Sequence, residues 1–580
     1  MAIFKRNLAI VGIGPRGSYA LECYILELAQ RKILKNLHLL LFDSEGNYGH
    51  GPVYGLTQND ANWLNITDRI ILIESRPEVT FEKIKIPSFP SYHKWIGEEF
   101  SSRSRSVDHY PKRAKLGLYL QKRFQSLVCP LIEENIVSLI QCKVKKVDTG
   151  GDYFSIECED DQRFKKIDEI LLTIGHQPTQ DSPQIAEWKN IIDKEHHIKL
   201  YNSPYPLNTY LNDDLDYDSS IGIRGFGLAM IDIIRGIVSK VGTLELIDPK
   251  KRKYNYSTPI NIKNLIVPFS LDGLPPVPKP LNQEIDNLYK PSEKEIASFE
   301  DSIGNRENQE KAKNINFLID AFAPIAADAY LSLRPTNNRE PIFKEGIIQV
   351  IKDWLYDEHI KHHTIISNDL SPYSLMKKYV DIATGVQDVS LDYCIGQVWR
   401  HCQPSIYDTL SFNSCNNEVV ASIVKLDERV KRYSFGPPVD SVQQIIALVD
   451  ADVLNLDYVN NPTIELSKAG WELSKNANSI MVKTMINSVL DAPKIKIIDS
   501  PILKHLLANN IIRAVHDDLG IATDEYGYLS SKDNLNMPIA VLGRLAKGTI
   551  IGVDAILECY GKRPQSWASK AADYHELCVK

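Results

Sequence analysis

The chain opens on an apolar run that leads directly into a glycine-rich turn. Leu8–Val11 is followed by Gly12–Gly17, which has the spacing G-x-G-x-x-G, and then by a helical pattern around Tyr19–Glu22. This order predicts a strand, a tight turn and a helix. Gly12 permits the turn, Gly14 lets the backbone approach a pyrophosphate, and Gly17 lets the helix pack on the sheet. The N–H groups of the helix N-terminus would bind the phosphates.

A second apolar run, Leu37–Phe42, ends at an acidic residue, Asp43. A carboxylate at this position can accept a hydrogen bond from a ribose hydroxyl of a dinucleotide. The interval from Gly17 to Asp43 exceeds the roughly 20 residues expected, so the helix or its exit loop must be extended. Glu45 competes with Asp43 for this role, and a purely structural strand–helix turn remains the alternative interpretation.

The same logic recurs near the middle of the chain, after the apolar Ile221–Ile223. Gly225–Met230 reads G-x-G-x-x-M, with Met230 at the position of the third glycine, and apolar residues then recur at helical spacing up to Ile237. The next strand candidate, Leu244–Ile247, ends at Asp248, an interval close to the roughly 20 residues expected. The pattern predicts a second βαβ nucleotide-binding unit.

A run of basic residues, Lys250–Lys253, follows this second unit. Cations at the end of the second strand can bind an adenosine 2′-phosphate, so the sequence favours NADPH over NADH. Arg224, inside the turn, is a second candidate, and a solvated basic turn is the plain alternative. Two such units in one chain suggest that a flavin held by the first exchanges electrons with a pyridine nucleotide held by the second.

Composition places few further constraints on function. The 580 residues are 43% hydrophobic and 24% charged, with a net charge of −7, so nothing favours nucleic acid or an anionic membrane. The nine cysteines include no C-x-x-C pair, which indicates reduced cysteines in the cytoplasm and no metal site. No apolar run approaches the roughly 18 residues of a membrane-spanning helix.

Several unusual segments carry a family resemblance. They are, in chain order with Gly12–Gly17, the stretches Gly49–Gly55, Asp60–Ile66, Tyr110–Leu120, Glu169–His176 and Phe435–Pro438. Together they resemble the bacterial FAD/NAD(P)-binding protein family related to flavin-dependent N-hydroxylating monooxygenases, which includes aspartate-oxidising nitrosuccinate synthases. The resemblance implies FAD and NADPH as cofactors, and O2 and an amine or amino acid as substrates. It also implies oxygen transfer through a flavin C4a-hydroperoxide.

The resemblance also assigns roles to individual residues. It places Asp43 and the three glycines of the first turn on the FAD adenosine diphosphate, and Gly51–Tyr54 and Trp63–Asn65 near the flavin ring, although Trp63 suits a core position equally well. It makes Arg113 a pyrophosphate partner. Because histidine titrates near neutral pH, His50 and His176 are candidate proton carriers, with a purely structural loop histidine as the alternative. The expected cofactor-binding residues are Gly12, Gly14, Pro15, Gly17, Asp43, Ser44, Gly51, Tyr54, Trp63, Arg113, Gly175, Arg224, Gly225, Gly227, Lys250, Arg252, Gly543 and Gly552, and the expected catalytic residues are His50 and Asn65.

Near the C-terminus the sequence departs from the pattern of many FAD enzymes. Their closing strand ends in Gly-Asp, whereas this chain has Gly543-Arg544. A helix beginning near Gly552 would then have to direct its N–H groups at the flavin.

The expected fold is α/β, with two Rossmann-like units and a helical insertion. Residues 1–215 form the first part of a discontinuous FAD domain, 216–280 the NADP(H) unit, 281–399 a helical insertion and 400–580 the return of the FAD domain. The insertion, entered through the proline-rich Leu274–Pro280, either covers a substrate pocket or mediates formation of a homodimer. Arg334, Arg339 and Arg400 are the candidates for binding a substrate carboxylate, since guanidinium groups bind carboxylates in a bidentate manner.

Two other functions fit the same motifs. An FAD-dependent NAD(P)H oxidoreductase or dehydrogenase would pass electrons to an acceptor other than oxygen. A non-catalytic FAD- or nucleotide-binding protein would hold the cofactor without turnover.

Overall fold

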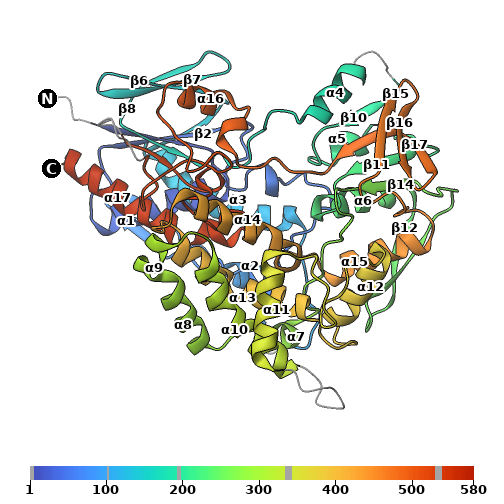
Figure 1. Ribbon diagram of the computed structural model, residues 1–580. Coiled ribbons are helices and arrows are strands. Elements are labelled where there is room, and N and C mark those ends of the chain that lie inside the picture. The colour runs from blue at the N-terminus through green and yellow to red at the C-terminus, as the bar shows by residue number, and fades with distance from the viewer. Residues whose placement is uncertain are drawn as a thin grey trace.

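The computed structural model describes residues 5–100, 104–192, 197–213, 215–333, 343–529 and 538–579. It contains two α/β parts, seen left and right in Figure 1, and a layer of helices below them. Both α/β parts are built on sheets with parallel strands, which confirms the predicted fold class. Within the described residues, no helix is long and apolar enough to cross a membrane.

The first sheet has five parallel strands in the order β18-β9-β1-β2-β5. Its strands are β1 (Arg6–Val11), β2 (Leu37–Asp43), β5 (Val137–Gln141), β9 (Glu169–Leu172) and β18 (Ile539–Val541). The strand order reverses at β1, between β2 and β9, and ligands of open α/β sheets bind beyond the carboxyl ends of the strands at such a point. The predicted strands at 8–11 and 37–42 are confirmed by β1 and β2.

Both faces of the first sheet are covered. On one face pack α1 (Pro15–Gln30), α3 (Arg113–Glu133) and α17 (Lys562–Val579). On the other face lie β6 (Val144–Gly150), β7 (Tyr153–Cys158), β8 (Arg163–Ile167) and α16 (Pro501–Ala508). The hairpin β3 (Val79–Phe81) and β4 (Ile84–Ile86) and the short α2 (Tyr92–Ile96) complete this part.

One pair of cysteines departs from the sequence-based expectation. Cys142 and Cys158 form a disulfide with a Cα–Cα distance of 6.0 Å. The sequence predicted reduced cysteines, and this was wrong for this pair. The spacing of 16 residues carries no motif, and only the pairing of β6 with β7 brings the two side chains together.

The second sheet is assembled from distant segments. Its strands are β10 (Lys199–Tyr201), β11 (Ser220–Arg224), β14 (Ile266–Phe269), β15 (Thr463–Ser467), β16 (Gly470–Lys475) and β17 (Asn478–Asn487), and the helices of this part are α4 (Pro183–Ile192), α5 (Asn208–Leu211) and α6 (Leu228–Val241). β11 lies between β14 and β17 and is parallel to both. The expected return segment 400–580 therefore divides: its strands β15–β17 complete the second sheet, and α16, β18 and α17 return to the first part.

The strand predicted to close the second βαβ unit lies elsewhere. β12 (Thr243–Asp248) forms an antiparallel hairpin with β13 (Lys253–Ser257), and β14 takes the place beside β11. The reason lies in the residue pattern. β12 alternates between exposed and half-buried positions, which suits a strand at the surface, whereas every residue of β14 is buried, as in a central parallel strand.

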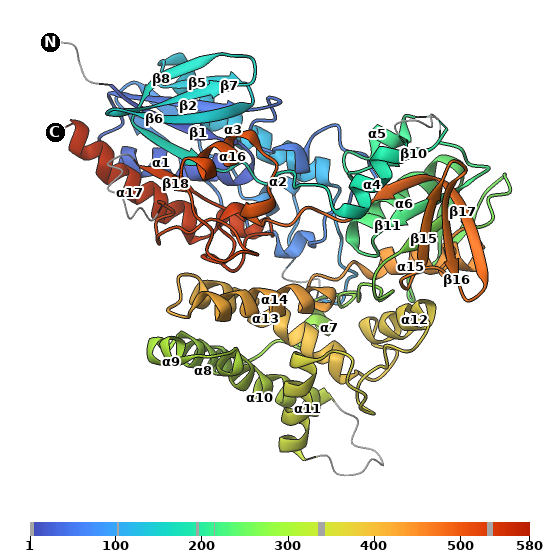
Figure 2. The same ribbon diagram turned by 45° about the horizontal axis from the view of Figure 1, so that its top comes forward.

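The helical part is longer than the predicted insertion and extends to residue 450. Its helices are α7 (Gln283–Asn287), α8 (Glu293–Gly304), α9 (Arg306–Lys311), α10 (Asn316–Leu333), α11 (Lys344–Tyr356), α12 (Pro372–Ala383), α13 (Leu391–Leu410), α14 (Asn417–Ser434) and α15 (Val439–Asp450). In Figure 2, α8–α11 lie beneath α13 and α14. One continuous apolar core joins these helices to the second sheet.

Candidate functional site

The first glycine turn has the geometry that its spacing predicts. Gly12 has φ +97°, and a Cβ there would lie 2.7 Å from the Thr173 carbonyl oxygen. A Cβ on Gly17 would lie 2.2 Å from the carbonyl oxygen of Gly12, so α1 packs against the turn only because this residue is glycine. Gly14 differs, because its nearest neighbour, the Cα of Gly51, would be 3.7 Å from an added Cβ. The protein itself leaves room at Gly14, directly before Pro15 opens α1.

The loop carrying Gly51 and Tyr54 packs on this turn. Gly51 has φ +63° and lies against Gly14, and Tyr54 ends a short 3₁₀ helix that begins at Pro52. His50 is buried, and its Nδ1 lies 2.8 Å from the Gly51 carbonyl oxygen. The ring of His50, a predicted proton carrier, is therefore held beneath this loop.

Asp43 ends β2 at the same edge of the sheet. Its Oδ1 accepts the N–H groups of Glu45 at 3.1 Å and Asn47 at 2.8 Å, which fixes the turn that follows the strand. No hydrogen bond joins its Oδ2 to any residue that the structure describes. Glu45, the competing residue, accepts a hydrogen bond from the side-chain amide of Asn47, and Ser44 is exposed. The geometry thus leaves one oxygen of Asp43 for a ribose hydroxyl.

Arg16, which was not among the predicted site residues, connects the first turn to the C-terminal segment. Its side chain fills the space above Gly543, where an added Cβ would lie 2.6 Å from Arg16 Nε. Its Nη1 donates to the carbonyl oxygen of Glu558 at 2.8 Å. The sequence could have indicated this role of Arg16, because it is the charged residue within the glycine turn.

The helix expected near Gly552 is absent, so this prediction was wrong. After β18 the chain makes short 3₁₀ turns, and α17 begins at Lys562. A Cβ on Gly552 would lie 2.2 Å from the ring of Tyr407 on α13. Gly552 is therefore required for packing against Tyr407 and not for starting a helix.

Arg544, which stands where many FAD enzymes have aspartate, forms an ion pair with Asp554. Asp554 also pairs with Lys431 of α14 at 2.7 Å and with Lys547 at 2.9 Å. Burial alone would raise the pKa of Asp554, but these three cations outweigh it and hold the pKa well below its usual range. The segment after β18 is thus tied to α14 through one carboxylate.

Trp63 and Asn65 have defined partners. The guanidinium of Arg235, on α6, lies 4.0 Å from the ring centroid of Trp63, so one face of the ring is occupied. The side-chain amide of Asn65 donates to the Phe435 carbonyl oxygen at 2.6 Å. Its Oδ1 is buried and has no hydrogen-bond partner. An unpaired buried acceptor is costly unless a donor such as a ring N–H reaches it.

Arg113 joins the two α/β parts. It donates to Asp232 Oδ2 at 3.1 Å and to the Tyr205 hydroxyl at 3.1 Å, and the Tyr205 hydroxyl donates to Asp232 at 2.7 Å. Arg113 is therefore paired with Asp232 of α6, a carboxylate that Arg235 also contacts at 3.3 Å. Arg16, at the first turn, differs from Arg113. In the described structure its guanidinium donates to backbone carbonyl oxygens and to no carboxylate.

Two titratable side chains at the carboxyl edge of the first sheet are accessible to solvent and yet strongly affected by burial. His176, after Gly175, is exposed, but the surrounding protein and then Arg544 lower its pKa to about 4. Glu558 is half-buried, and burial raises its pKa to about 7. An added Cβ on Gly175 would meet nothing within 4 Å, so this turn borders open space.

The second glycine turn repeats the arrangement of the first. Gly225 has φ +117°, and a Cβ there would lie 2.3 Å from Ser488 Oγ. Gly227 is exposed, with nothing within 4 Å of an added Cβ, and α6 begins at Leu228. Met230, at the position of the third glycine, is buried. As in the first turn, the second glycine is the open position.

The cations proposed for a 2′-phosphate differ in their partners. Arg224 donates to the neutral side chains of Gln184 at 3.0 Å and Asn487 at 3.1 Å. Arg252 forms a bidentate pair with Asp440, at 2.6 and 2.9 Å, so its charge is balanced. Lys250 is exposed in the turn of the β12–β13 hairpin, apart from the sheet that carries Gly225. Of the two arginines, Arg252 is paired with a carboxylate, whereas the hydrogen-bond partners of the Arg224 side chain in the described structure are neutral.

Of the arginines considered for a substrate carboxylate, Arg334 and Arg339 lie outside the described residues. Arg400 lies on α13, where its Nη2 donates to Asp286 and its Nε donates to Gln397 at 3.0 Å.

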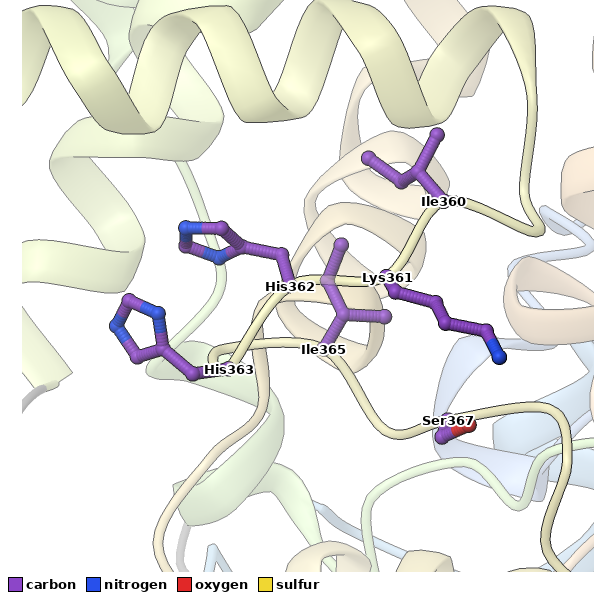
Figure 3. A pocket seen from close by; sticks show the side chains of 6 residues that line it. All are labelled: Ile360, Lys361, His362, His363, Ile365 and Ser367. Atoms are coloured by element: carbon purple, nitrogen blue, oxygen red, sulfur yellow. The ribbon is translucent and has the colours of Figure 1, made fainter.

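A surface pocket of about 290 Å³ lies in the loop between α11 and α12. Figure 3 shows its lining residues Ile360, Lys361, His362, His363, Ile365 and Ser367. None of the predicted site residues lines it, so the two glycine turns and the pocket are separate features.

Comparison with families of known proteins gives a match in the first third of the chain. Residues 9–177 match the family described as FAD-NAD(P)-binding. This range contains the first glycine turn, Asp43 and Gly175, and it is an FAD/NAD(P)-binding domain, as the resemblance implied. Among curated protein sequences, none matches the chain.

Solved structures that match nearly the whole chain do so at low identity and with TM-scores below 0.5. Ornithine hydroxylase (PvdA) from Pseudomonas aeruginosa is 11% identical with a TM-score of 0.43, covering 99% of this chain and 100% of that one. L-lysine 6-monooxygenase from Pseudomonas syringae is 13% identical with a TM-score of 0.46 and the same coverage. Lysine monooxygenase NbtG from Nocardia farcinica is 11% identical with a TM-score of 0.41, covering 97% and 98%.

Proposed function

We propose that the chain is an FAD-dependent, NADPH- and O2-using monooxygenase that oxygenates the nitrogen of an amino acid or small amine. The observation that carries this proposal is the pair of glycine turns on two joined sheets, each with its second glycine left open by the protein. Two dinucleotide sites in one chain suit the transfer of a hydride from one cofactor to the other.

The residues at the first turn fit FAD. Gly14 provides an open cradle, Asp43 a free carboxylate oxygen, and Asn65 an unpaired buried acceptor. Gly12, Gly14, Gly17 and Asp43 would hold the adenosine diphosphate, with Arg16 as the cation nearest the turn, and Asn65 would accept a hydrogen bond from the ring. When bound and reduced, the flavin supplies the chemistry that splits O2 and delivers one oxygen atom.

The chain's own contribution is to bind, orient and manage protons. Arg113 contacts Asp232 of α6 and Arg235 contacts Trp63, so these residues hold the two α/β parts together and would fix the separation of the two bound cofactors. Glu558 holds or releases a proton near neutral pH, because burial raises its pKa to about 7. His176 is neutral at this pH, because burial and Arg544 lower its pKa.

At the second turn, replacement of Arg224 should weaken NADPH binding. We expect Arg224→Gln to raise the KM for NADPH at least about tenfold, because a hydrogen bond to a charged group contributes roughly 1.5–3 kcal/mol. Arg252→Ala is the control, since Asp440 already balances its charge, and it should change this KM by less than about threefold. The measurement is the rate of flavin reduction at varied NADPH. If Arg252→Ala raised the KM for NADPH more than Arg224→Gln, the 2′-phosphate would instead be assigned to Lys250–Lys253.

The proposed activity predicts a yellow protein that consumes oxygen in step with NADPH. We expect a panel of amines and amino acids, aspartate among them, to contain a compound that raises both rates together and yields an N-oxygenated product by mass spectrometry. Turnover with an electron acceptor without oxygen would instead identify a dehydrogenase. A protein that binds FAD and turns over with no acceptor would be a non-catalytic binding protein, and a protein that cannot bind FAD would remove the proposal.

A further inference from the structure

The loop between α11 and α12 is closed at its base. The side-chain amide of Asn368 donates to the Glu358 carbonyl oxygen at 3.0 Å, which brings residues 358 and 368 together. At the surface of the loop, exposed Lys361 and Asp369 form an ion pair at 2.6 Å. A compact surface loop whose two ends meet in this way is an Ω-loop, and such loops move as units.

The 358–368 loop rests on the start of α13 through two hydrogen bonds. The Leu391 N–H donates to the Thr364 carbonyl oxygen at 2.8 Å, and the Ile366 N–H donates to Asp392 Oδ1 at 3.2 Å. Thr364 is the one buried residue of the loop, and the residues on either side of it line the surface pocket shown in Figure 3. An element with so little buried apolar surface belongs to the least stable parts of a fold.

Arg432 of α14 lies against the base of this loop and is incompletely paired. Its Nε donates to the Pro275 carbonyl oxygen at 3.0 Å, whereas its Nη1 and Nη2 are buried and have no hydrogen-bond partner in the described structure. Glu358 Oε2 lies 3.7 Å from Nη1, which is beyond hydrogen-bonding distance. Asn368 Oδ1 and Ser390 Oγ are likewise buried and unpaired.

The closed loop therefore has a cost that opening would remove. A buried donor without an acceptor has lost its hydration without compensation, and this cost is larger for a charged group. Lifting the loop returns water to Arg432 and to Asn368. It gives up two hydrogen bonds to α13, which water can replace, and little apolar contact.

We propose that residues 358–368 form a lid that opens and closes over Arg432 while the rest of the protein stays folded. The lid covers a structural joint, because Arg432 holds the connector Leu274–Pro280 on α14. It does so through Pro275 and through its own carbonyl oxygen, which accepts the Val277 N–H at 3.0 Å. The inference goes beyond the proposed function and does not depend on it, so a failure to bind flavin or to turn over would leave the lid in place.

Chemical labelling of arginines in the full-length wild-type protein tests the lid. Phenylglyoxal reacts with the two Nη atoms of an arginine, so Arg432 reacts only when the lid is open. Exposed Arg105 should react fastest, and Arg76, which is fully buried and paired with Glu22, should react slowest. We expect Arg432 to react at least about tenfold faster than Arg76, measured by peptide mass spectrometry, because local opening is more frequent than global unfolding.

Two results of this labelling would overturn the inference. If Arg432 reacted no faster than Arg76, access would require unfolding of the core and not opening of a lid. If Arg432 reacted as fast as Arg105, the loop would not close over the guanidinium at all.

Two arginines of α14 provide a matched pair of variants. Arg432→Met removes the unpaired donors and should slow hydrogen exchange of residues 359–367 at least about threefold. Arg429→Met should instead speed this exchange, because Arg429 Nη1 donates to the Tyr356 carbonyl oxygen at 2.9 Å and its Nη2 to that of Leu355, at the end of α11 where the loop begins. Hydrogen exchange followed by mass spectrometry measures both effects.

Thermal unfolding checks that both variants are folded. Unchanged or faster exchange in folded Arg432→Met would contradict the proposal, and so would slower exchange in Arg429→Met. If either variant fails to fold, the labelling of the wild-type protein decides alone.

Discussion

Gly14→Ala should lower the affinity for FAD at least about a hundredfold, equivalent to roughly 2.7 kcal/mol, while the apoprotein keeps its melting temperature. The backbone at Gly14 has φ −76°, which alanine adopts readily, and the nearest atom would lie 3.7 Å from the new Cβ. The protein therefore tolerates the methyl group, but a pyrophosphate at this position does not. Flavin absorbance after reconstitution and thermal unfolding of the apoprotein measure the two effects separately.

Neighbouring glycines provide matched controls for this variant. Gly227→Ala places a methyl group at the equivalent open position of the second turn, so it should retain FAD and lose NADPH binding. Gly17→Ala should prevent folding, because its Cβ would lie 2.2 Å from the carbonyl oxygen of Gly12. If Gly14→Ala retained normal FAD binding, the first turn would not hold the pyrophosphate.

Asp554→Asn should destabilise the folded protein by about 3–5 kcal/mol, the usual cost of removing one partner of a buried ion pair. Arg544 would lose its carboxylate partner, while Lys431 and Lys547 would be left to share Glu428. Chemical denaturation followed by fluorescence measures the change. Asp573→Asn is the control, because Asp573 is half exposed in a surface pair with Arg31 and should cost less than about 1 kcal/mol.

The pH dependence of this difference has a definite sign. Because the folded pKa of Asp554 is held well below its unfolded value of about 4, its contribution to stability is complete above that value. The contribution is lost as the pH falls towards the folded pKa. The gap in stability between wild type and Asp554→Asn should therefore be constant from pH 6 to 8 and shrink below about pH 4. A gap that grew on acidification would contradict the ion-pair account.

The first nucleotide turn could be predicted from sequence because its determinants are local. Leu8–Val11, the three glycines and Leu37–Asp43 lie within one stretch, and each residue type follows from a short-range steric or hydrogen-bonding need. The second glycine turn was predictable for the same reason. The end of its βαβ unit was not, because Leu244–Ile247 predicts the next strand of the unit, whereas its alternation of exposed and half-buried positions places it in a surface hairpin.

Most of the remaining site depends on contacts between distant segments. Arg235 faces Trp63, and Lys431 faces Asp554, across large separations in the chain. No spacing rule connects such pairs, so Lys431 and Asp554 carried no signal that set them apart. Arg113 was singled out by its motif, but its pairing with Asp232 becomes visible only once α3 and α6 are placed side by side.

The strand order has a consequence for how the protein is made. β17, which lies between β11 and β16, ends at Asn487, and β18, which closes the first sheet beside β9, ends at Val541. Neither sheet can be completed until most of the chain has left the ribosome. During synthesis, which proceeds at about 5–20 residues per second, β11 and β9 each wait many seconds with an unpaired edge. Such edges bind other strands. We therefore expect newly made chains to depend on chaperones, and truncation before residue 541 to yield aggregates and no smaller active enzyme.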